Sequence, residues 1–406
     1  MTSGGLLFDK ELVPSPCFVL DAPRLAANAA VLDRVQRRTG AKILLALKAY
    51  AAFATFPLLS RFTGSGPLWG VCASSVDEAR LGREEFGGEV HAFAAAWSME
   101  EMAAVLPLTD CLVFNSITQW RRFRPVIANW NSSRAHGVAC GLRINPEHSE
   151  VAVPLYDPCS PSSRLGIRPR EFREISPEDR RGLTGLHFHT LCELNADALE
   201  RTLAAVEKNF SPWIGECQWL NFGGGHHITR EDYDVDLLCR LLTDWRARYG
   251  AQIYLEPGEA VALDAGWLVA TVLDVVPADM PVALLDVSAA CHTPDVLEMP
   301  YRPRVLYQTG GGTERAGAAG EKAFTCRLAG KSCLAGDAFG EYSFAEPLRD
   351  GQRLIFEDMA IYSMVKSTTF NGLRLPSIGI CETEAGKPGF RLQREFSYAD
   401  FRNRLS

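Results

Sequence analysis

The chain has 406 residues, of which 47% are hydrophobic and 22% are charged, the balance of an ordinary globular protein. Its 42 Lys and Arg against 49 Asp and Glu give a formal net charge of −7 without any block of like charges, so nucleic acid is not expected as a partner. No apolar run approaches the roughly 18 residues that cross a bilayer, so no membrane partner is expected.

Short apolar runs recur along the first two-thirds of the chain, and helix-like stretches separate them. Each run is nearly continuously apolar, as expected of parallel strands that are covered on both faces. The runs predicted as strands are residues 41–49, 68–74, 89–95, 111–116, 137–145, 183–190, 219–225 and 251–259. Ser75, Ser98 and Ser116 each precede a helical pattern and are predicted helix N-caps. Two further helices are predicted at 196–210 and 232–249.

This alternation predicts a (β/α)8 barrel, because eight strand–helix units fit into about 220 residues. The competing fold is a doubly wound sheet, which needs a nucleotide-binding turn after its first strand. The segment LALKAYAAF (45–53) offers no such turn. The barrel, predicted to span residues 25–265, is therefore favoured.

After Gly266 the pattern changes to short apolar runs with turn residues between them, which is typical of an antiparallel β domain. These runs are residues 267–276, 281–288, 302–310, 323–330, 351–358 and 375–382. The segment 310–322 is poor in apolar residues and is predicted to be a mobile hairpin loop. The N-terminal PCFVLDA (16–22) is predicted to add a strand. The β domain, a sandwich or barrel, is therefore expected to comprise residues 266–406 together with 1–24.

The cysteines and the N-terminus indicate a cellular compartment. Twelve cysteines are scattered along the chain without a C-x-x-C spacing, so neither a zinc site nor a disulfide framework is predicted. The first residues, MTSGGLLFDKELVPSP, lack the basic start and apolar core of a secretory signal. A reducing, cytoplasmic location is expected.

In barrels of this kind the active site lies at the carboxyl ends of the strands. The residues at that level are polar or glycine: Lys48, Ser74, Asn115, Arg143, His189, Gly223–Gly225 and Glu256. Functional residues are therefore expected where the strands end.

Each member of this set has a plain structural interpretation beside a chemical one. Lys48 is either a lysine that extends from a strand end into solvent or a buried lysine ready to form a Schiff base. Gly223–Gly225 form either a tight turn or a phosphate site, where bare backbone N–H groups approach an anion. Glu256 is either a strand-end acid or the partner of a protonated pyridine nitrogen, and His189 could stack on a planar ring. Together these residues describe a pyridoxal phosphate site.

A metal site is the main alternative from the residues alone. His187 and His189 are separated by one residue and therefore point to the same face of a strand. Such a pair can hold zinc in barrel hydrolases. No other strand end supplies a histidine, and the eighth strand ends in Glu256 followed by proline rather than in a lone aspartate. His187 is therefore interpreted as a satisfied core residue, and no metal site is predicted.

The chain resembles the fold-type III pyridoxal phosphate decarboxylases, the group of ornithine and diaminopimelate decarboxylases, which share their barrel with alanine racemase. Within that group it is most similar to the carboxynorspermidine/carboxyspermidine decarboxylases. The motifs that carry the likeness are PSPCFVLD, LALKAY, FHTLCE, NFGGGHHIT, LEPGEA, DVSAACHTPDVLEMPYRP, GKSCLAGD and FEDMAIYSMVK. The likeness implies decarboxylation of a cationic, carboxylated polyamine in polyamine biosynthesis. Which of the two substrates is preferred stays open, because a pocket discriminates one methylene only weakly.

The resemblance also implies roles for individual residues. Lys48 would form the Schiff base, His189 would stack on the cofactor ring and Glu256 would pair with its nitrogen. The residues implied around the rest of the cofactor are Arg143 beside the phenolic oxygen, and Gly223, Gly224, Gly225 and Tyr362 at the phosphate.

The pair Cys333 and Asp337 matches the family's catalytic Cys-x-x-x-Asp, which enters the site from the partner subunit of a homodimer. Cys333 would help to protonate the decarboxylated carbon. A cysteine is more often a small buried hydrophobe, so its CLAGD context carries this assignment. A non-catalytic homologue that only binds a partner is disfavoured because Lys48 and this pair are both present. Another amino-acid decarboxylase or a racemase on the same fold is disfavoured by LEPGEA and PDVLEMPYRP.

The sequence departs from the family at Glu259, where relatives have an arginine that grips the phosphate. Phosphate binding must then depend more on the glycines and Tyr362. Glu259 and Asp295 become candidates for binding the substrate's amines, and Asp337 is placed with them. Both Glu259 and Asp295 could instead be solvated surface acids.

Overall fold

The computed structural model describes residue 8, residues 12–384 and residues 387–406. The chain divides into two compact units. One unit comprises residues 26–261, and the other comprises residues 1–25 and 262–406.

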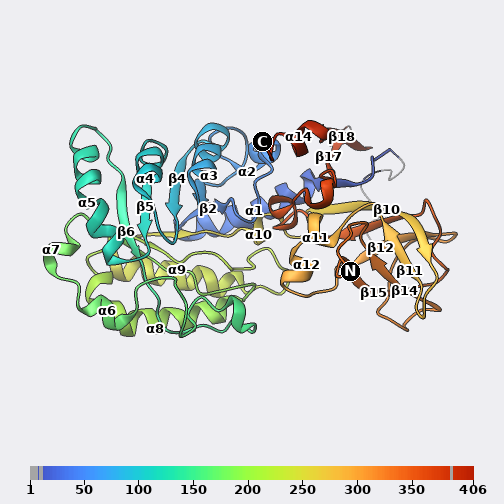
Figure 1. Cartoon of the computed structure of the whole chain (residues 1–406). Coiled ribbons are helices and arrows are strands. Elements are labelled where there is room, and N and C mark those ends of the chain that lie inside the picture. The colour runs from blue at the N-terminus through green and yellow to red at the C-terminus, as the bar shows by residue number, and fades with distance from the viewer. Residues whose placement is uncertain (1–7, 9–11, 385–386) are drawn as a thin grey trace. The chain divides into compact units, whose positions relative to one another are not determined.

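The first unit is a closed barrel of eight parallel strands (Figure 1). The strands are β2 (Lys42–Ala46), β3 (Gly70–Ala73), β4 (Glu89–Phe93), β5 (Cys111–Phe114), β6 (Ala139–Arg143), β7 (Gly185–His187), β8 (Trp219–Asn221) and β9 (Gln252–Leu255). Each strand pairs with the next, and β9 pairs with β2 to close the barrel. The predicted (β/α)8 barrel is confirmed, and each strand is shorter than the apolar run that predicted it.

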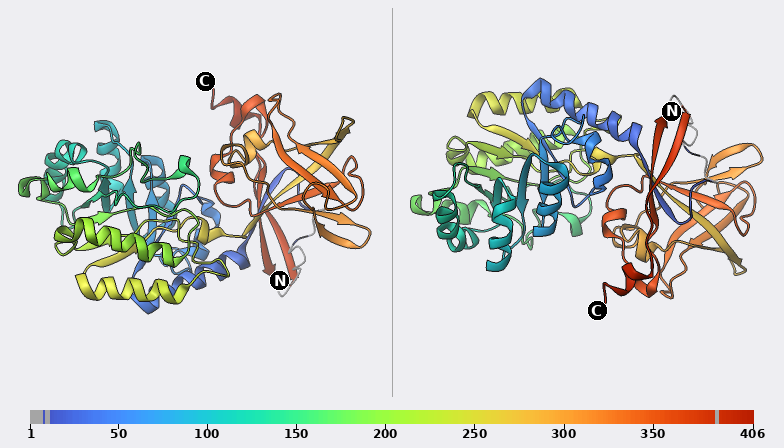
Figure 2. Two further views of the ribbon diagram at one scale, coloured as in Figure 1. Left: turned by 90° about the horizontal axis from the view of Figure 1, so that it is seen from below. Right: turned by 90° about the horizontal axis from the view of Figure 1, so that it is seen from above.

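Three helices of this unit begin at the capping serines that the sequence predicts. Ser75, Ser98 and Ser116 cap the first turns of α3 (Val76–Leu81), α4 (Met99–Val105) and α5 (Ile117–Ser132) with their side chains. The other helices are α1 (Ala22–Thr39), α2 (Phe56–Leu59), α6 (Pro169–Arg173), α7 (Pro177–Arg180), α8 (Ala196–Ile214), α9 (Val235–Tyr249) and α10 (Glu259–Ala262). Helices α8 and α9 lie side by side on the outside of the barrel (Figures 1 and 2).

The barrel interior holds charged groups where such barrels usually hold branched apolar side chains. Lys42 forms an ion pair with Glu89, and the Tyr254 hydroxyl donates to Glu89 at 2.9 Å. Burial alone would raise the pKa of Glu89, but hydrogen bonds from His91 and Lys42 outweigh it and lower that pKa to about 2. A paired, ionised carboxylate therefore sits at the start of β4.

The second unit is built on a ten-stranded sheet. Its strands are β1 (Cys17–Asp21), β10 (Gly266–Val276), β11 (Val282–Leu285), β12 (Val305–Thr309), β13 (Gly312–Arg315), β14 (Phe324–Ala329), β15 (Ala338–Phe344), β16 (Arg353–Glu357), β17 (Ser377–Glu384) and β18 (Lys387–Arg394). The main path runs β13-β12-β16-β10-β1-β17-β18, and β11, β14 and β15 extend it from β10. The predicted β domain and its N-terminal strand are confirmed.

This sheet differs from the prediction in two ways. The pairs β1–β17 and β11–β14 are parallel, so the sheet is mixed rather than purely antiparallel. The segment 310–322, predicted to be a loop, contains β13, which pairs with β12. Strand β13 is mostly exposed and lacks the apolar residues on which the prediction of strands rested. The short helices of this unit are α11 (Ala289–His292), α12 (Asp295–Glu298), α13 (Ser363–Lys366) and α14 (Tyr398–Arg402).

Candidate active site

The barrel site is organised around the carboxylate of Glu256, just after β9. Strand register places His187 beside Asn221, and Asn221 beside Tyr254, two residues before Glu256. The Glu256 side chain is only 11% exposed. Its Oε2 lies 3.1 Å from His187 Nε2, and its Oε1 accepts a hydrogen bond of 2.7 Å from Asn221 Nδ2. Both carboxylate oxygens are therefore bound by neighbouring strands.

This arrangement keeps Glu256 ionised. Burial would raise the pKa of Glu256, but its interactions with His187, then the electrostatic effect of His91 and then the Asn221 hydrogen bond outweigh burial and lower that pKa to about 2. Burial lowers the pKa of His187, so this imidazole is neutral at pH 7 and donates from Nε2. His187 is thus more than the satisfied core residue expected, because it binds a site carboxylate. An ionised carboxylate in this position suits a cationic nitrogen.

His189 and Arg143 lie at the same end of the barrel. His189 Nδ1 accepts the N–H of Gly224 at 2.8 Å. Burial, followed by the charges of Lys48 and Arg143, lowers the pKa of His189 well below its usual range, so its imidazole is neutral. Arg143 is 5% exposed and lies over the Phe93 ring, 4.7 Å from its centre. Burial lowers the pKa of Arg143 to about 10, which leaves it charged at neutral pH.

The Arg143 guanidinium has donors to spare. Its one hydrogen bond to the described residues goes from Nη2 to the His189 carbonyl at 3.2 Å. A guanidinium carries five N–H donors. A buried cation with unused donors suits an oxygen atom of a ligand.

The glycine turn after β8 leaves no room for side chains. Gly223 and Gly225 have φ of +69° and +81°, which favour glycine. A Cβ atom would approach a backbone oxygen to 2.4 Å at Gly223, 2.4 Å at Gly224 and 2.0 Å at Gly225. The tight-turn interpretation of this triplet therefore holds, whatever else the turn binds.

The same turn offers fewer free donors than expected. The Gly223 amide donates to Asn221 Oδ1 at 2.9 Å, and the Gly224 amide donates to His189. Of the three glycine amides, only that of Gly225 makes no hydrogen bond with the described part of the chain. An anion at this turn would therefore meet one unpaired glycine N–H rather than three.

Lys48 is exposed at the carboxyl end of the barrel. Strand β2 ends at Ala46, and Lys48 lies in the turn that follows, where it is exposed. Of the two interpretations offered by the sequence, the exposure of Lys48 matches the lysine that extends into solvent, and its role as the Schiff-base lysine stays a prediction. Its charge still acts on His189 and on Glu78, which places it at the carboxyl end of the barrel with the other predicted residues.

Glu259 is not the solvated surface acid of the alternative interpretation. Its side chain is 16% exposed, and its Oε2 lies 3.4 Å from His227 Nε2. Burial raises the pKa of Glu193, and the negative charge of Glu259 raises it further. Sequence reasoning missed Glu193, although it is the last residue of FHTLCE. Two carboxylates therefore share one part of the site.

Cys333 and Asp337 lie together in the sheet unit. Asp337 is buried, and its two oxygens accept the N–H groups of Ala290 and Ser332, each at 3.1 Å. Cys333 is exposed, and its N–H donates to Asn371 Oδ1 at 2.9 Å. In this chain Asp337 holds the loop that carries Cys333, and its binding of substrate stays a prediction.

Asp295, in the same unit, is already paired. Lys366 Nζ donates to Asp295 Oδ1 at 2.5 Å and also binds Glu298. Tyr362, which precedes α13, has a φ of +48°. The proposed contacts of Asp295 with an amine and of Tyr362 with a phosphate stay predictions.

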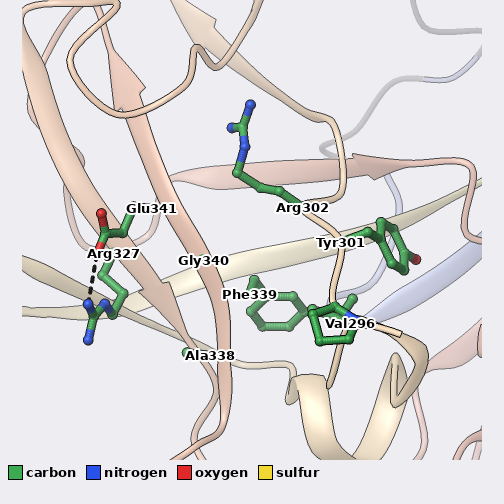
Figure 3. A pocket seen from close by; sticks show the side chains of 9 residues that line it. Val296, Tyr301, Arg302, Arg327, Ala338, Phe339, Gly340 and Glu341 are labelled. Atoms are coloured by element: carbon green, nitrogen blue, oxygen red, sulfur yellow. Dashed lines mark hydrogen bonds and ion pairs between the residues drawn. The ribbon is translucent and has the colours of Figure 1, made fainter. Parts of the chain in front are cut away.

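A pocket of about 580 Å³ also lies in the sheet unit (Figure 3). It is lined by Val296, Pro300, Tyr301, Arg302, Arg327, Ala338, Phe339, Gly340 and Glu341. Arg327 and Glu341 form an ion pair of 2.7 Å at its edge (Figure 3). None of the predicted site residues lines it, so it is not the candidate active site.

The predicted residues of the barrel fit pyridoxal phosphate. Glu256 is an ionised partner for a ring nitrogen, Arg143 has spare donors and Lys48 supplies an accessible amine. Among the described residues no group of three or more His, Cys, Asp or Glu is arranged to hold a metal ion. In that same part of the chain, no helix is long and apolar enough to cross a membrane.

Comparison with known proteins gives matches over nearly the whole chain. Residues 17–360 match the family described as "Pyridoxal-dependent decarboxylase, C-terminal sheet domain". A carboxyaminopropylagmatine decarboxylase of Synechocystis is 43% identical over 97% of this chain and 96% of that protein. A carboxynorspermidine/carboxyspermidine decarboxylase of Campylobacter jejuni is 38% identical over 96% of this chain and 98% of that protein.

Solved structures also match nearly the whole chain. The crystal structure of Campylobacter jejuni carboxynorspermidine decarboxylase complexed with norspermidine has a TM-score of 0.83 at 36% identity, covering 97% of this chain and all of that one. Diaminopimelate decarboxylase of Helicobacter pylori has a TM-score of 0.81 at 15% identity, with 97% of each chain covered, a likeness of fold alone.

We predict that Glu256 makes the cofactor-free protein sensitive to acid. Its folded-state pKa of about 2 lies below the ordinary value of about 4.3, so its stabilisation is full above pH 5 and is lost as the pH falls towards 2. A shift of this size corresponds to about 3 kcal/mol. The free energy of unfolding, measured by urea titration between pH 5 and 3, should fall less steeply in Glu256→Gln than in the wild type. Equal slopes would show that Glu256 has an ordinary pKa.

Proposed function

Because this chain belongs to the pyridoxal-dependent decarboxylase family, we propose that it removes the α-carboxylate of carboxynorspermidine or carboxyspermidine and releases norspermidine or spermidine. The chain is a decarboxylase, a carboxy-lyase of polyamine biosynthesis. The observation that carries the proposal is the buried, ionised Glu256 at the barrel end that also holds Lys48, Arg143 and His189.

A second candidate substrate is carboxyaminopropylagmatine. The Synechocystis relative of that name is 43% identical, against 38% for the Campylobacter jejuni relative. An agmatine end carries a planar guanidinium, whose five N–H donors could bind a pair of carboxylates. Glu193 and Glu259 supply such a pair in the barrel.

We assign the cofactor site to the barrel residues. Bound pyridoxal phosphate supplies an electron sink for the pair of electrons left on Cα when the carboxylate departs. Lys48 Nζ would hold the cofactor, His189 would lie against its ring, and Glu256 would keep the proton on the ring nitrogen. Arg143 donates to the phenolic oxygen. The phosphate depends on the Gly225 amide and Tyr362, because Glu259 replaces the family arginine.

We assign the proton that returns to Cα to Cys333. This residue comes from the partner subunit of a homodimer, and its buried neighbour Asp337 fixes the loop on which it lies. The carboxylates of Glu259 and Asp295 bind the amines of the substrate. We also propose a cytoplasmic location for the protein.

We predict that Lys48 carries the cofactor. Purified protein should be yellow, because Lys48 offers an exposed amine beside a neutral His189 and an ionised Glu256. Borohydride reduction followed by peptide mapping should locate the pyridoxyl group on Lys48. Lys42, paired with Glu89, is the internal control and should stay unmodified. A pyridoxyl group on another lysine would disprove the assignment.

We predict that Glu259→Gln and Asp295→Asn weaken kcat/KM for the carboxylated triamine by about 2–4 kcal/mol each, as for a buried charge pair that loses one partner. Cofactor absorbance should survive in both variants. Glu298→Gln is the matched control, because Glu298 also binds Lys366. If Glu298→Gln acts as strongly as Asp295→Asn, then Asp295 works through Lys366 and not on the substrate.

We predict a shared active site in the homodimer. Lys48→Ala and Cys333→Ala should each be nearly inactive alone. After subunit exchange half of the dimers are hybrid, and each hybrid has one intact site, so about a quarter of wild-type activity should return. No recovery, with exchange verified by differently tagged subunits, would mean that both residues act within one chain.

A further inference from the structure

Two neutral side chains hold the Glu256 carboxylate, and they come from two different strands. His187 on β7 binds Oε2 at 3.1 Å, and Asn221 on β8 binds Oε1 at 2.7 Å. The His187 side chain is 3% exposed, and its ring stacks on Phe93 with the centroids 5.7 Å apart. This imidazole is fixed by its surroundings and has little freedom to turn away from Glu256.

Because His187 and Asn221 are both neutral, they do not cancel the negative charge of Glu256. A lysine or arginine in either position would orient Glu256 equally well but would cancel its charge. Neutral donors orient the carboxylate and leave its negative charge available for a cation. The groups that face Glu256 from the other strands are Cys72 on β3, His91 on β4, Cys111 on β5 and Arg143 on β6. Burial raises the pKa of both thiols well above their usual range, so these cysteines are uncharged.

The same hydrogen bonds reach the glycine turn. Asn221 uses its Nδ2 for Glu256 and its Oδ1 for the Gly223 N–H. The Glu256 backbone N–H in turn donates to the Gly223 carbonyl at 2.8 Å. The carboxylate and the turn are therefore held as one unit.

We propose that His187 is a positioning residue of the decarboxylase: together with Asn221 it fixes Glu256 as an ionised, oriented carboxylate, so that Glu256 holds a proton on the ring nitrogen of the cofactor. This inference rests on the proposed function for the identity of the cofactor. It assigns His187 to the reaction through Glu256 and not through contact with substrate.

The test measures the ionisation of the Glu256 carboxylate in the cofactor-free protein. Carbon-13 NMR of protein labelled at glutamate carboxyl carbons would identify Glu256 by the signal lost in Glu256→Gln. In wild-type protein this signal should not titrate between pH 4.5 and 8. In His187→Leu it should titrate inside that window, which requires the pKa of Glu256 to rise from about 2 to above roughly 4.5, because burial then acts with one donor fewer. His187→Gln, which restores a neutral donor, should return the signal to wild-type behaviour.

The matched control is His91→Leu. His91 is another buried histidine of the barrel interior, but its Nε2 lies 3.3 Å from Glu89 and it makes no hydrogen bond to Glu256 among the described residues. Its loss should shift the Glu256 signal less than His187→Leu. If His187→Leu does not fold, Asn221→Ala applies the same test through the other donor.

Kinetics of the cofactor-loaded enzyme give a second measurement. His187→Leu should lower kcat about 10- to 100-fold, the usual effect of losing a group that orients a catalytic one. KM should change little, and His187→Gln should recover most of kcat. An unshifted Glu256 signal in His187→Leu, equal shifts in His91→Leu, or failure of His187→Gln to restore both readouts would overturn the proposal. The apoprotein titration needs neither cofactor nor substrate, so it can fail while the mapping of Lys48 succeeds.

Discussion

A carboxylate inside a protein needs hydrogen-bond donors, because burial without them costs several kcal/mol. Glu256 meets this requirement through the register of three adjacent strands, β7, β8 and β9. His187 and Asn221 donate to its two oxygens, and Asn221 also accepts from the first glycine of the turn. The position of the turn and the ionisation of Glu256 therefore depend on the same few hydrogen bonds.

The charges of this site differ from those of a plain phosphate-binding barrel. The Glu259 side chain is only 16% exposed, and Glu193 lies close enough for the two charges to interact. These acids weaken the attraction for a phosphate and strengthen the attraction for ammonium or guanidinium groups. Arg143 is the buried cation of the site and keeps spare donors for the cofactor. A cationic substrate is the ligand that this balance of charge favours.

Local patterns in the sequence were sufficient to predict the barrel. The apolar runs predicted all eight strands, and Ser75, Ser98 and Ser116 predicted three helix starts, because both signals act over a few residues. The sequence did not predict which residues from distant segments contact one another. The partnership of His187 with Glu256 joins residues 69 apart, and that of Lys366 with Asp295 joins residues 71 apart. The sequence also left open whether Lys48 is exposed or buried, because the apolar run continues to Leu47 while β2 ends at Ala46. The positions in the barrel site were thus predictable, but their hydrogen-bond partners were not.

The central claim is that this chain decarboxylates a carboxylated polyamine. The most direct measurement is steady-state release of CO2 from carboxynorspermidine, carboxyspermidine and carboxyaminopropylagmatine by the purified, cofactor-loaded protein, with Lys48→Ala as the blank. We expect release of CO2 in equal amount to the polyamine product from at least one of the three, far above the blank. Release no greater than that of Lys48→Ala from all three substrates would contradict the account.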